Sequence, residues 1–329
     1  MNWNIWQLKT KATLRNIFDR QVWVAAVLSL LIMGCTSKQA QEPLPNASNY
    51  NFFIISDMGE TLNYGNDSVA AVLNRLAPVI QPRFIISSGD FFHNAGVKSI
   101  DDSLWPLMNA KIFASPFMKV DVYPIDGNHE YIGNSQAPID YSAKSQHWKM
   151  EALNYTIVKK IDSSTSVRFV MIDTSPFVEK YKNDPKYHMV KLQDSKKTVV
   201  WLDSVLRTSH EEWKVVVGHH PIYSSDFGQG STYELIKYVD PLLKKYKVDL
   251  YFSGHIHKFE HVHRKGMDYF STTNGGSVPR IATPWFYTRF VKKTLGFTVC
   301  SVSGEKFSIY FVDKRGKVVY TFHKKKSEK

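Results

Sequence analysis

The feature that most constrains the fold of this chain is an alternation of short apolar runs with longer amphipathic segments, which begins at residue 51. The apolar runs are rich in β-branched and aromatic residues, as buried strands are. They cover residues 51–56, 83–88, 120–125, 167–172, 214–218 and 248–253. Helical patterns cover residues 66–79, 102–113, 194–208 and 232–246. This order predicts an α/β fold.

The C-terminal part has a different pattern. Its apolar segments "GFTVCSVSG", "EKFSIYFVD" and "KVVYTFH" are separated by Gly or Lys-Arg-Gly turns, which predicts an antiparallel meander. With 329 residues, of which 43% are hydrophobic, the chain can fill a sizeable core. We therefore expect an α/β (α+β) domain built as a two-sheet β-sandwich flanked by helices.

The first 34 residues are typical of a secretory signal peptide, because basic residues precede an apolar run. That run covers residues 22–33, whereas a membrane-spanning helix needs about 20 apolar residues. It ends in "LIMGC", which resembles a bacterial lipobox, in which cleavage leaves Cys35 to carry lipid. The alternative is an ordinary cleaved signal peptide with an incidental cysteine.

This interpretation divides the chain into a signal peptide (1–34), a polar tether with two prolines (35–48), a folded domain (49–323) and a basic tail (324–329). The only other cysteine is Cys300, so no internal disulfide is expected. We expect a monomer in the cell envelope, lipid-anchored at Cys35 on the periplasmic side or at the outer membrane of a bacterium.

The net charge of +12 favours anionic partners. Much of the positive excess lies in the first 20 residues and in the tail "HKKKSEK", which we interpret as a leader and a solvated end. The sequence has no nucleic-acid recognition motif and no basic stripe with interleaved aromatics. We therefore expect no specific nucleic-acid partner.

Polar residues that suit metal binding stand directly after the expected strands. They lie in "SDMG" (56–59), "GDFFH" (89–93), "GNHE" (127–130), "GHHP" (218–221) and "GHIH" (254–257). Each motif alone has a simpler explanation, such as a helix cap or a turn. Because sites in α/β folds form at the carboxyl ends of strands, five such motifs indicate one shared site. Carboxylate, amide and imidazole ligands suit iron, manganese and zinc.

These motifs resemble those of the calcineurin-like metallophosphoesterases, most closely the small tartrate-resistant purple acid phosphatases. Further resemblance lies in "NAGV", "IGNSQAPIDYS", "MIDT" and "YKVDLYFSGHIH", and it covers nearly all of residues 50–323. The resemblance implies a four-layer fold, a dinuclear metal centre and hydrolysis of phosphate esters.

The resemblance also implies the ligands. The first ion would be held by Asp57, Asp90, the residue at position 93 and His257, and the second by Asp90, Asn128, His219 and His255. Asp90 would bridge the two ions. A pair of ions about 3.5–4 Å apart can clamp a phosphoryl group and acidify a water molecule, so no side-chain nucleophile is needed.

Two further histidines follow ligand positions. His129 matches the family's histidine that contacts substrate and protonates the leaving group, a role suited to a pKa near the working pH. The alternative for His129 is a structural role behind the site. His220 stands where the small phosphatases usually have tyrosine, and it either touches substrate or packs beside the site.

Position 93 departs from the purple phosphatases, in which a tyrosine phenolate binds ferric iron there and gives the colour. Related metallophosphoesterases supply a histidine two positions after the first aspartate, but that position is Gly59 here. We therefore interpret His93 as a ligand rather than a loop residue. Neutral imidazole removes a negative charge and favours a divalent pair. We expect a colourless protein with a pH optimum nearer neutral.

Two loops also depart from the family. Phe227 or Gly228 stands where the small phosphatases have another histidine near the substrate, so substrate preference does not carry over. The Gly/Pro-rich loop of residues 274–286 suits a lid or a pocket rim. Arg280 in that loop meets phosphate or is a surface charge.

The sequence is thus interpreted as that of a lipid-anchored, dinuclear metal-dependent phosphomonoesterase that acts on small phosphate esters outside the cytoplasm. One alternative is a phosphodiesterase or nucleotide pyrophosphatase on the same metals. Another is a binding lipoprotein that has lost catalysis, against which the intact ligand positions argue.

The lipobox interpretation predicts that Cys35 carries the lipid. Cells fed a labelled fatty acid should label the natural protein and leave Cys35→Ala unlabelled, because no other residue offers the required thiol at the cleavage junction. Label on both proteins would contradict the assignment.

Overall fold

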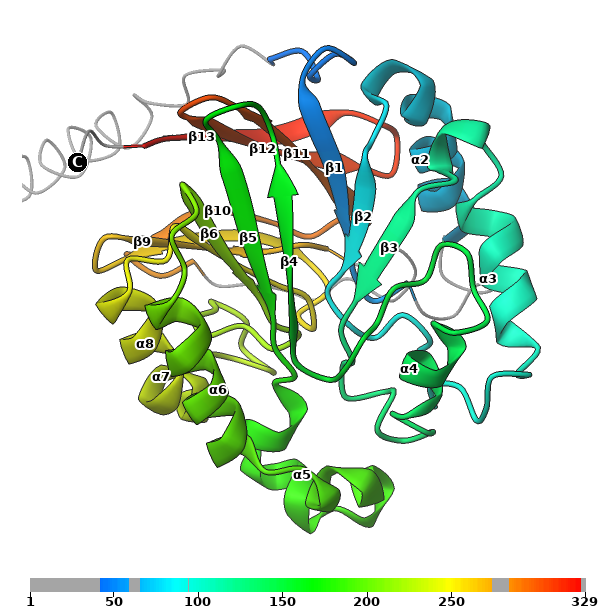
Figure 1. Ribbon diagram of the computed structural model, residues 1–329, viewed down its shortest axis with the longest axis vertical. Coiled ribbons are helices and arrows are strands. Elements are labelled where there is room, and N and C mark those ends of the chain that lie inside the picture. Colours follow the sequence, from blue (N-terminus) through cyan, green and yellow to red (C-terminus); the bar gives the residue numbers. More distant parts are fainter. Residues whose placement is uncertain (1–41, 59–65, 94, 274–283, 327–329) are drawn as a thin grey trace, which may run out of the picture. The chain divides into compact units, whose positions relative to one another are not determined.

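The computed structural model describes residues 42–58, 66–93, 95–273 and 284–326 (Figure 1). The expected signal peptide, Cys35 and Arg280 lie outside this range. No helix among the described residues is long and apolar enough to cross a bilayer.

The first sheet has six strands in the order β13-β12-β11-β1-β2-β3. The strands are β1 (Tyr50–Ile55), β2 (Phe84–Ser87), β3 (Asp121–Pro124), β11 (Gly296–Ser303), β12 (Lys306–Asp313) and β13 (Val318–Lys325). Strands β1, β2 and β3 are parallel, and the last three strands form the expected antiparallel meander, which joins the sheet through β1 and β11.

The second sheet has seven strands in the order β10-β8-β9-β7-β6-β5-β4. The strands are β4 (Tyr155–Lys160), β5 (Ser166–Met171), β6 (Trp213–Val217), β7 (Leu250–Ser253), β8 (Phe259–Arg264), β9 (Met267–Ser271) and β10 (Thr288–Lys292). Strands β5, β6, β7 and β9 are parallel, so β5, β6 and β7 direct their carboxyl ends to one edge.

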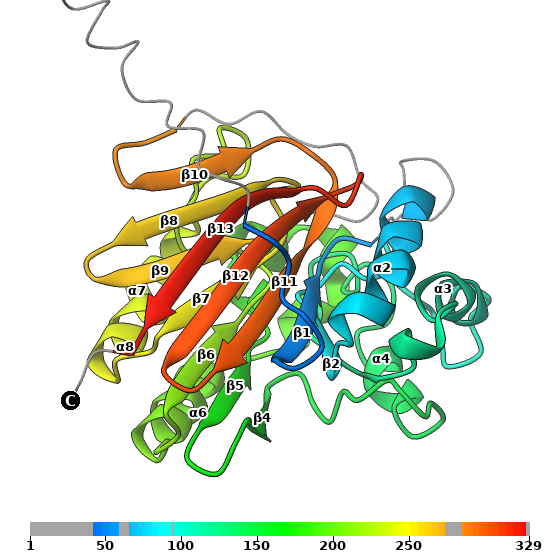
Figure 2. The ribbon, with the colours of Figure 1, turned by 90° about the horizontal axis from the view of Figure 1, so that it is seen from above.

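Helices cover the outer faces of the two sheets. Beside the first sheet lie α2 (Asn66–Ile80), α3 (Leu104–Ile112) and α4 (Ala137–Tyr141), and beside the second lie α6 (Ser195–Arg207), α7 (Tyr233–Tyr238) and α8 (Asp240–Lys245) (Figures 1 and 2). The short helix α5 (Glu179–Asn183) and the 3-10 segments η2 (Ser175–Phe177) and η3 (Pro185–Leu192) extend from the carboxyl end of β5. A further 3-10 turn, η1 (Pro116–Met118), follows α3.

Aromatic rings join the two sheets face to face. Phe52 of β1 stacks on Phe84 of β2 with ring centroids 4.6 Å apart, and its edge meets Phe169 of β5 at 5.3 Å. Phe307 of β12 packs against Trp213 of β6. All of these side chains are buried, which explains why their strands read as continuous apolar runs. The structure confirms the predicted two-sheet α/β sandwich flanked by helices.

Two expectations about elements need correction. The single helix expected at residues 232–246 is two short helices, because Pro241 at the start of α8 cannot continue the preceding helix. Strands β4, β8, β9 and β10 were not expected. In β8 the segment "FEHVHR" is polar, yet its first four residues are buried, so it lacks the apolar run that marks a strand.

Both ends of the described chain pack more closely on the domain than the proposed boundaries imply. Strand β13 continues to Lys325, past the expected domain end at residue 323, and Lys324 Nζ lies 2.6 Å from Asp268 Oδ2. Glu42, in the expected tether, lies 2.6 Å from His323 Nε2. Lys324, which the sequence assigns to a solvated tail, is therefore part of the folded domain.

Asp268 ties three strands together. It lies on β9, and its carboxylate meets His261 and His263 of β8 at 3.1 and 2.6 Å and Lys324 of β13. Burial alone would raise the pKa of Asp268, but these partners hold it well below its usual range. A depressed native pKa stabilises the fold above the unfolded-state pKa of about 3.9, and that stabilisation is lost as pH falls through the native pKa.

We therefore predict that Asp268→Asn lowers the free energy of unfolding by about 2–4 kcal/mol at pH 7. The difference from the natural protein should shrink below pH ~4, as measured by urea unfolding across pH. Asp101→Asn, at an exposed pair with Lys144, is the control and should change stability little. A difference for Asp268→Asn that stays constant from pH 7 to pH 3 would contradict this assignment.

Candidate metal centre

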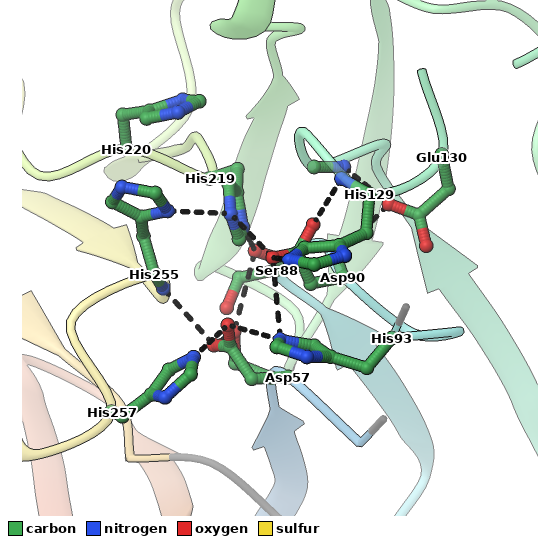
Figure 3. Close-up of polar contacts among 12 residues, drawn as sticks. Asp57, Ser88, Asp90, His93, His129, Glu130, His219, His220, His255 and His257 are labelled. Carbon is green, nitrogen blue, oxygen red and sulfur yellow. Dashed lines mark hydrogen bonds and ion pairs between the residues drawn. The ribbon is translucent and has the colours of Figure 1, made fainter. Parts of the chain in front are cut away.

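The five sequence motifs converge at one edge of the sandwich, where strands of both sheets end (Figure 3). Asp57 follows β1, Asp90 and His93 follow β2, Asn128 follows β3, His219 follows β6, and His255 and His257 follow β7. The parallel strands of each sheet carry these loops to the same edge, and the face-to-face packing brings the two sets together. The structure thus brings every expected ligand position into one place.

His93 belongs to two of the overlapping groups of potential metal ligands, one with Asp57 and His257 and one with Asp90 and His129. Donor atoms of Asp57, His93 and His257 all lie within 4.8 Å of one another. His93 Nε2 is 3.7 Å from Asp57 Oδ1 and 3.5 Å from Asp90 Oδ2, and its side chain is only 11% exposed. His93 therefore faces the two aspartates, as a ligand would, and not the solvent.

Asp90 occupies the centre of the site. Its Oδ2 lies 3.2 Å from His219 Nε2, 3.5 Å from His93 Nε2 and 3.8 Å from His129 Nε2. His219 Nε2 in turn lies 3.2 Å from His255 Nδ1. One carboxylate thus faces imidazoles from three separate loops, which is the position that a bridging ligand requires.

Two buried oxygens indicate that an ion belongs here. Among the described residues, Asp57 Oδ1 and Asn128 Oδ1 have no hydrogen-bond partner. The nearest positive groups to Asp57 Oδ1 are imidazoles, with His257 Nε2 at 3.2 Å and His93 Nε2 at 3.7 Å. Because a buried oxygen without a partner is costly, coordination to a cation would satisfy both atoms. The combination of carboxylate, amide oxygen and imidazole fits the first-row metals expected from the sequence.

The backbone is strained where it presents the ligands. Asp57, Asp90, His255 and His257 have φ values of 48°, 49°, 70° and 52°, in the left-handed region that non-glycine residues rarely adopt. Such conformations cost of order 1–3 kcal/mol each and persist only when surrounding contacts enforce them. Their concentration at one site therefore agrees with a functional constraint on these loops.

Hydrogen bonds orient the ligand groups. His219 Nδ1 lies 2.9 Å from the carbonyl oxygen of Ser88, to which it donates, and this contact directs Nε2 toward Asp90. The other oxygen of Asp90 accepts the backbone N–H of His129 at 2.8 Å. The second oxygen of Asp57 accepts the backbone N–H of His255 at 3.0 Å. These contacts fix which atoms of each residue face the centre.

Glu130 joins two loops of the site through hydrogen bonds to their backbones, a role that the sequence did not suggest. Its carboxylate accepts the backbone N–H groups of Asp90, Phe92 and Gly127 at 3.1, 3.2 and 2.7 Å. Burial and then the charge of Asp90 raise the pKa of Glu130 to about 7. Glu130 therefore holds the loop after β2 against the loop after β3.

The site attracts positive charge. Burial would raise the pKa of Asp57 and of Asp90, but the neighbouring histidines hold the pKa of both carboxyl groups well below its usual range. Conversely, burial lowers the pKa of His219, yet Asp90 and Asp57 raise it to about 9. The field of the two carboxylates that favours protonated imidazole also favours a metal cation.

A cavity of about 300 Å³ opens onto the site. Asp90, Asn128, His129, His255 and His257 line its inner wall, and Lys180, Tyr181, Asp184, Tyr187 and Gln229 line the outer wall. The outer residues come mainly from α5 and η3, which the sequence analysis did not identify as part of a site. Gln229 Oε1 lies 3.1 Å from His255 Nε2, whereas Phe227 is 94% exposed and does not line this cavity.

The two histidines expected to act in catalysis have different surroundings. His129 lines the cavity with its side chain 20% exposed, and its ring stacks on His93 at 4.0 Å between centroids. His220 is buried, and its two ring nitrogens lie 2.9 Å from Thr174 Oγ1 and 3.1 Å from Tyr181 Oη. Burial and the neighbouring His255 and His219 hold the pKa of His220 well below its usual range. This geometry favours packing beside the site for His220, the alternative that the sequence left open.

Comparison with known proteins agrees with this geometry. The family described as "Calcineurin-like phosphoesterase" matches residues 50–259. Purple acid phosphatase 7 of Arabidopsis thaliana is 30% identical over 257 residues, which cover 75% of this chain and 77% of the relative. Human tartrate-resistant acid phosphatase type 5 is 28% identical over 270 residues, covering 76% of this chain and 82% of the relative. The structure of GAP50, the anchor in the inner membrane complex of Plasmodium, superposes with a TM-score of 0.74 at 23% identity, covering 85% of this chain and 90% of that one.

Gly127 offers a test of how the site is built. A Cβ atom at this position would lie 2.2 Å from Asp90 Oδ1 and 2.6 Å from Asp90 N, so it would displace the central carboxylate. Gly127→Ala should therefore lose at least half of the metal bound after reconstitution, as measured by elemental analysis. Gly228→Ala is the control, because its Cβ would meet nothing closer than 3.6 Å. A folded Gly127→Ala protein with full metal content would contradict the central position of Asp90.

Proposed function

This chain belongs to the calcineurin-like phosphoesterase family, and from that premise we propose that it hydrolyses phosphate monoesters at a dinuclear metal centre. The observation that carries the proposal is the placement of Asp90. Its buried carboxylate faces His93, His129 and His219, while Asp57 Oδ1, which faces His93 and His257, and Asn128 Oδ1 lack a hydrogen-bond partner among the described residues.

We propose two sets of ligands, one for each ion, that share Asp90. Asp57, Asp90, His93 and His257 hold the first ion, and Asp90, Asn128, His219 and His255 hold the second. When bound, such a pair polarises the phosphoryl group and acidifies the attacking water. The proposed metals are iron, manganese or zinc as a divalent pair, because His93 supplies a neutral ligand where a phenolate would supply a charge.

His129 is proposed to hold a proton for the leaving group. It lines the cavity, while its backbone N–H is fixed by Asp90 Oδ1, so the ring has a defined position beside the centre. A protonated imidazole there can donate to the departing oxygen and stabilise charge that develops on it.

The outer wall of the cavity is proposed to bind the substrate. Lys180 and Asp184 both line this wall, and the ammonium group of Lys180 suits an anionic ester. Tyr181 and Tyr187 add phenolic groups, and Gln229 adds an amide. A cavity of about 300 Å³ walled by α5 and η3 suits a small monoester better than an extended diester.

We also propose that the enzyme acts outside the cytoplasm, attached to the membrane by lipid on Cys35. The support for this comes from the sequence alone, through the basic and apolar leader and the "LIMGC" junction.

The direct test is hydrolysis of an aryl phosphate monoester and of its matching diester by protein that lacks residues 1–35 and is reconstituted with iron, manganese or zinc. We expect faster monoester turnover, an optimum near neutral pH and no intense visible band. Faster diester turnover would favour a phosphodiesterase. No turnover of either ester with both ion positions filled would contradict the proposed function.

The proton-donor role predicts a dependence on the leaving group. His129→Ala should lower kcat for an alkyl phosphate by about 10²-fold or more, because an alkoxide needs protonation as it departs. The loss should be smaller for a nitrophenyl phosphate, whose leaving group is stable without a proton. His188→Ala, outside the residues that line the cavity, is the matched control. Equal losses for the two esters would assign His129 a structural role instead.

A further inference from the structure

A second cavity, with none of the proposed metal ligands in its lining, contains three aromatic side chains. It has a volume of about 610 Å³ and is lined by residues including Phe227, Trp285, Tyr287, Pro284, Ser224 and Ser225. Phe227 is 94% exposed and Trp285 is 56% exposed. Because large aromatic groups are costly to leave in water, their gathering around one hollow indicates a binding surface.

One tight turn connects this cavity to the metal centre. Phe227 lines the aromatic cavity, whereas Gln229, two residues later, lines the metal cavity and contacts His255. Two residues of chain span at most about 7 Å. The two hollows are therefore close enough to hold different parts of one small molecule.

Buried contacts fix this turn in place. Asp226 Oδ1 accepts the backbone N–H groups of Gly228 and Gln229 at 2.8 and 2.5 Å. The other oxygen of Asp226 pairs with the fully buried Lys258. The backbone of the turn that carries Phe227 is thus fixed by buried contacts, so only the side chain of Phe227 has to be ordered when a ligand binds.

Polar contacts fix the serine side of the aromatic cavity. Ser224 and Ser225 line it, and Ser225 is 1% exposed. Ser224 Oγ and the Ser225 N–H both bond to the Glu260 carboxylate, at 2.8 Å each, and the Ser225 side chain contacts the same carboxylate. This part of the cavity is therefore held in place by a buried carboxylate.

The other two aromatic residues of this cavity pack against each other. The rings of Trp285 and Tyr287 are nearly parallel, with an interplanar angle of 21° and centroids 5.8 Å apart. Arg264 lies over the Tyr287 ring at 4.8 Å, and Tyr287 is buried. The Trp285 ring therefore packs on a buried neighbour, Tyr287, and its exposed part offers a flat apolar surface.

We propose that this cavity binds the leaving group of the substrate and selects phosphate esters that carry a flat aromatic ring, with a nucleobase as the fitting chemistry. Aromatic side chains stack on the flat faces of such rings. The inference rests on the proposed function, because it places the phosphoryl group at the metal centre while the ring occupies the neighbouring hollow.

The test compares two phosphate monoesters that differ in the leaving group, adenosine monophosphate and glycerol phosphate, on the reconstituted protein. Phe227→Ala and Trp285→Ala should each lower the ratio of kcat/KM for the nucleotide to that for glycerol phosphate by about 5- to 20-fold, mainly through KM. Phe117→Ala, at an exposed phenylalanine of η1 remote from both cavities, is the matched control and should leave the ratio unchanged.

Binding of adenosine, which carries no phosphate, separates this inference from the proposed function. Equilibrium dialysis should show that Phe227→Ala and Trp285→Ala bind adenosine at least fivefold more weakly than the natural protein, even if neither ester is hydrolysed. Unchanged selectivity or unchanged adenosine binding would overturn the subsite. A third result would also overturn the subsite: Phe227→Ala and Trp285→Ala no longer bind phosphatidylglycerol vesicles but keep the kcat/KM ratio of the natural protein. That result would assign the two aromatic residues to a membrane contact.

Discussion

The structure depends on one buried carboxylate, that of Asp90, and on the histidines gathered around it. A buried negative charge is costly unless positive groups and hydrogen-bond donors compensate it. Here His219, His93 and His129 approach one oxygen and a backbone N–H binds the other. The loops that supply these groups come from both sheets. The sandwich must therefore close in the correct register for this charge to be compensated, which links folding to assembly of the site.

Further contacts hold the residues around Asp90 in place. Glu130 binds three backbone N–H groups from two loops, and Gly127 leaves the space that the Asp90 carboxylate needs. Strained φ values at four ligand positions have the same explanation, since the surrounding hydrogen bonds hold conformations that the isolated loops would avoid. Rigidity of this kind favours catalysis, because groups held in position need little reorganisation when charge develops.

Much of the fold and of the site could be predicted from the sequence, because both depend on local patterns. Buried parallel strands read as apolar runs, and a metal ligand directly after such a run is placed by the strand itself. The sequence predicts His93 as a ligand because Gly59 stands where related enzymes have a histidine, and the structure places His93 beside Asp57 and Asp90. Helical periodicity continues on both sides of Pro241, so the sequence predicts one helix where the structure has two.

What the sequence could not reveal depends on contacts between distant segments. Glu130 was visible in "GNHE", but its role requires the loop after β2 to lie beside it. The outer wall of α5 and η3 comes from a polar segment without clear periodicity, and Gln229 lies in a loop whose direction only the fold determines. Strand β8 is polar because its histidines face Asp268, a tertiary pairing that no local pattern records.

The central claim is that two ions bind around Asp90 with His93 as a ligand. The most direct measurement is anomalous diffraction at the absorption edge of the metal, from crystals of the reconstituted protein. This account predicts two peaks about 3.5–4 Å apart, with the Asp90 carboxylate between them and His93 Nε2 about 2.0–2.1 Å from one peak, if zinc is the metal. A single peak, or two peaks with His93 directed away from both, would contradict it.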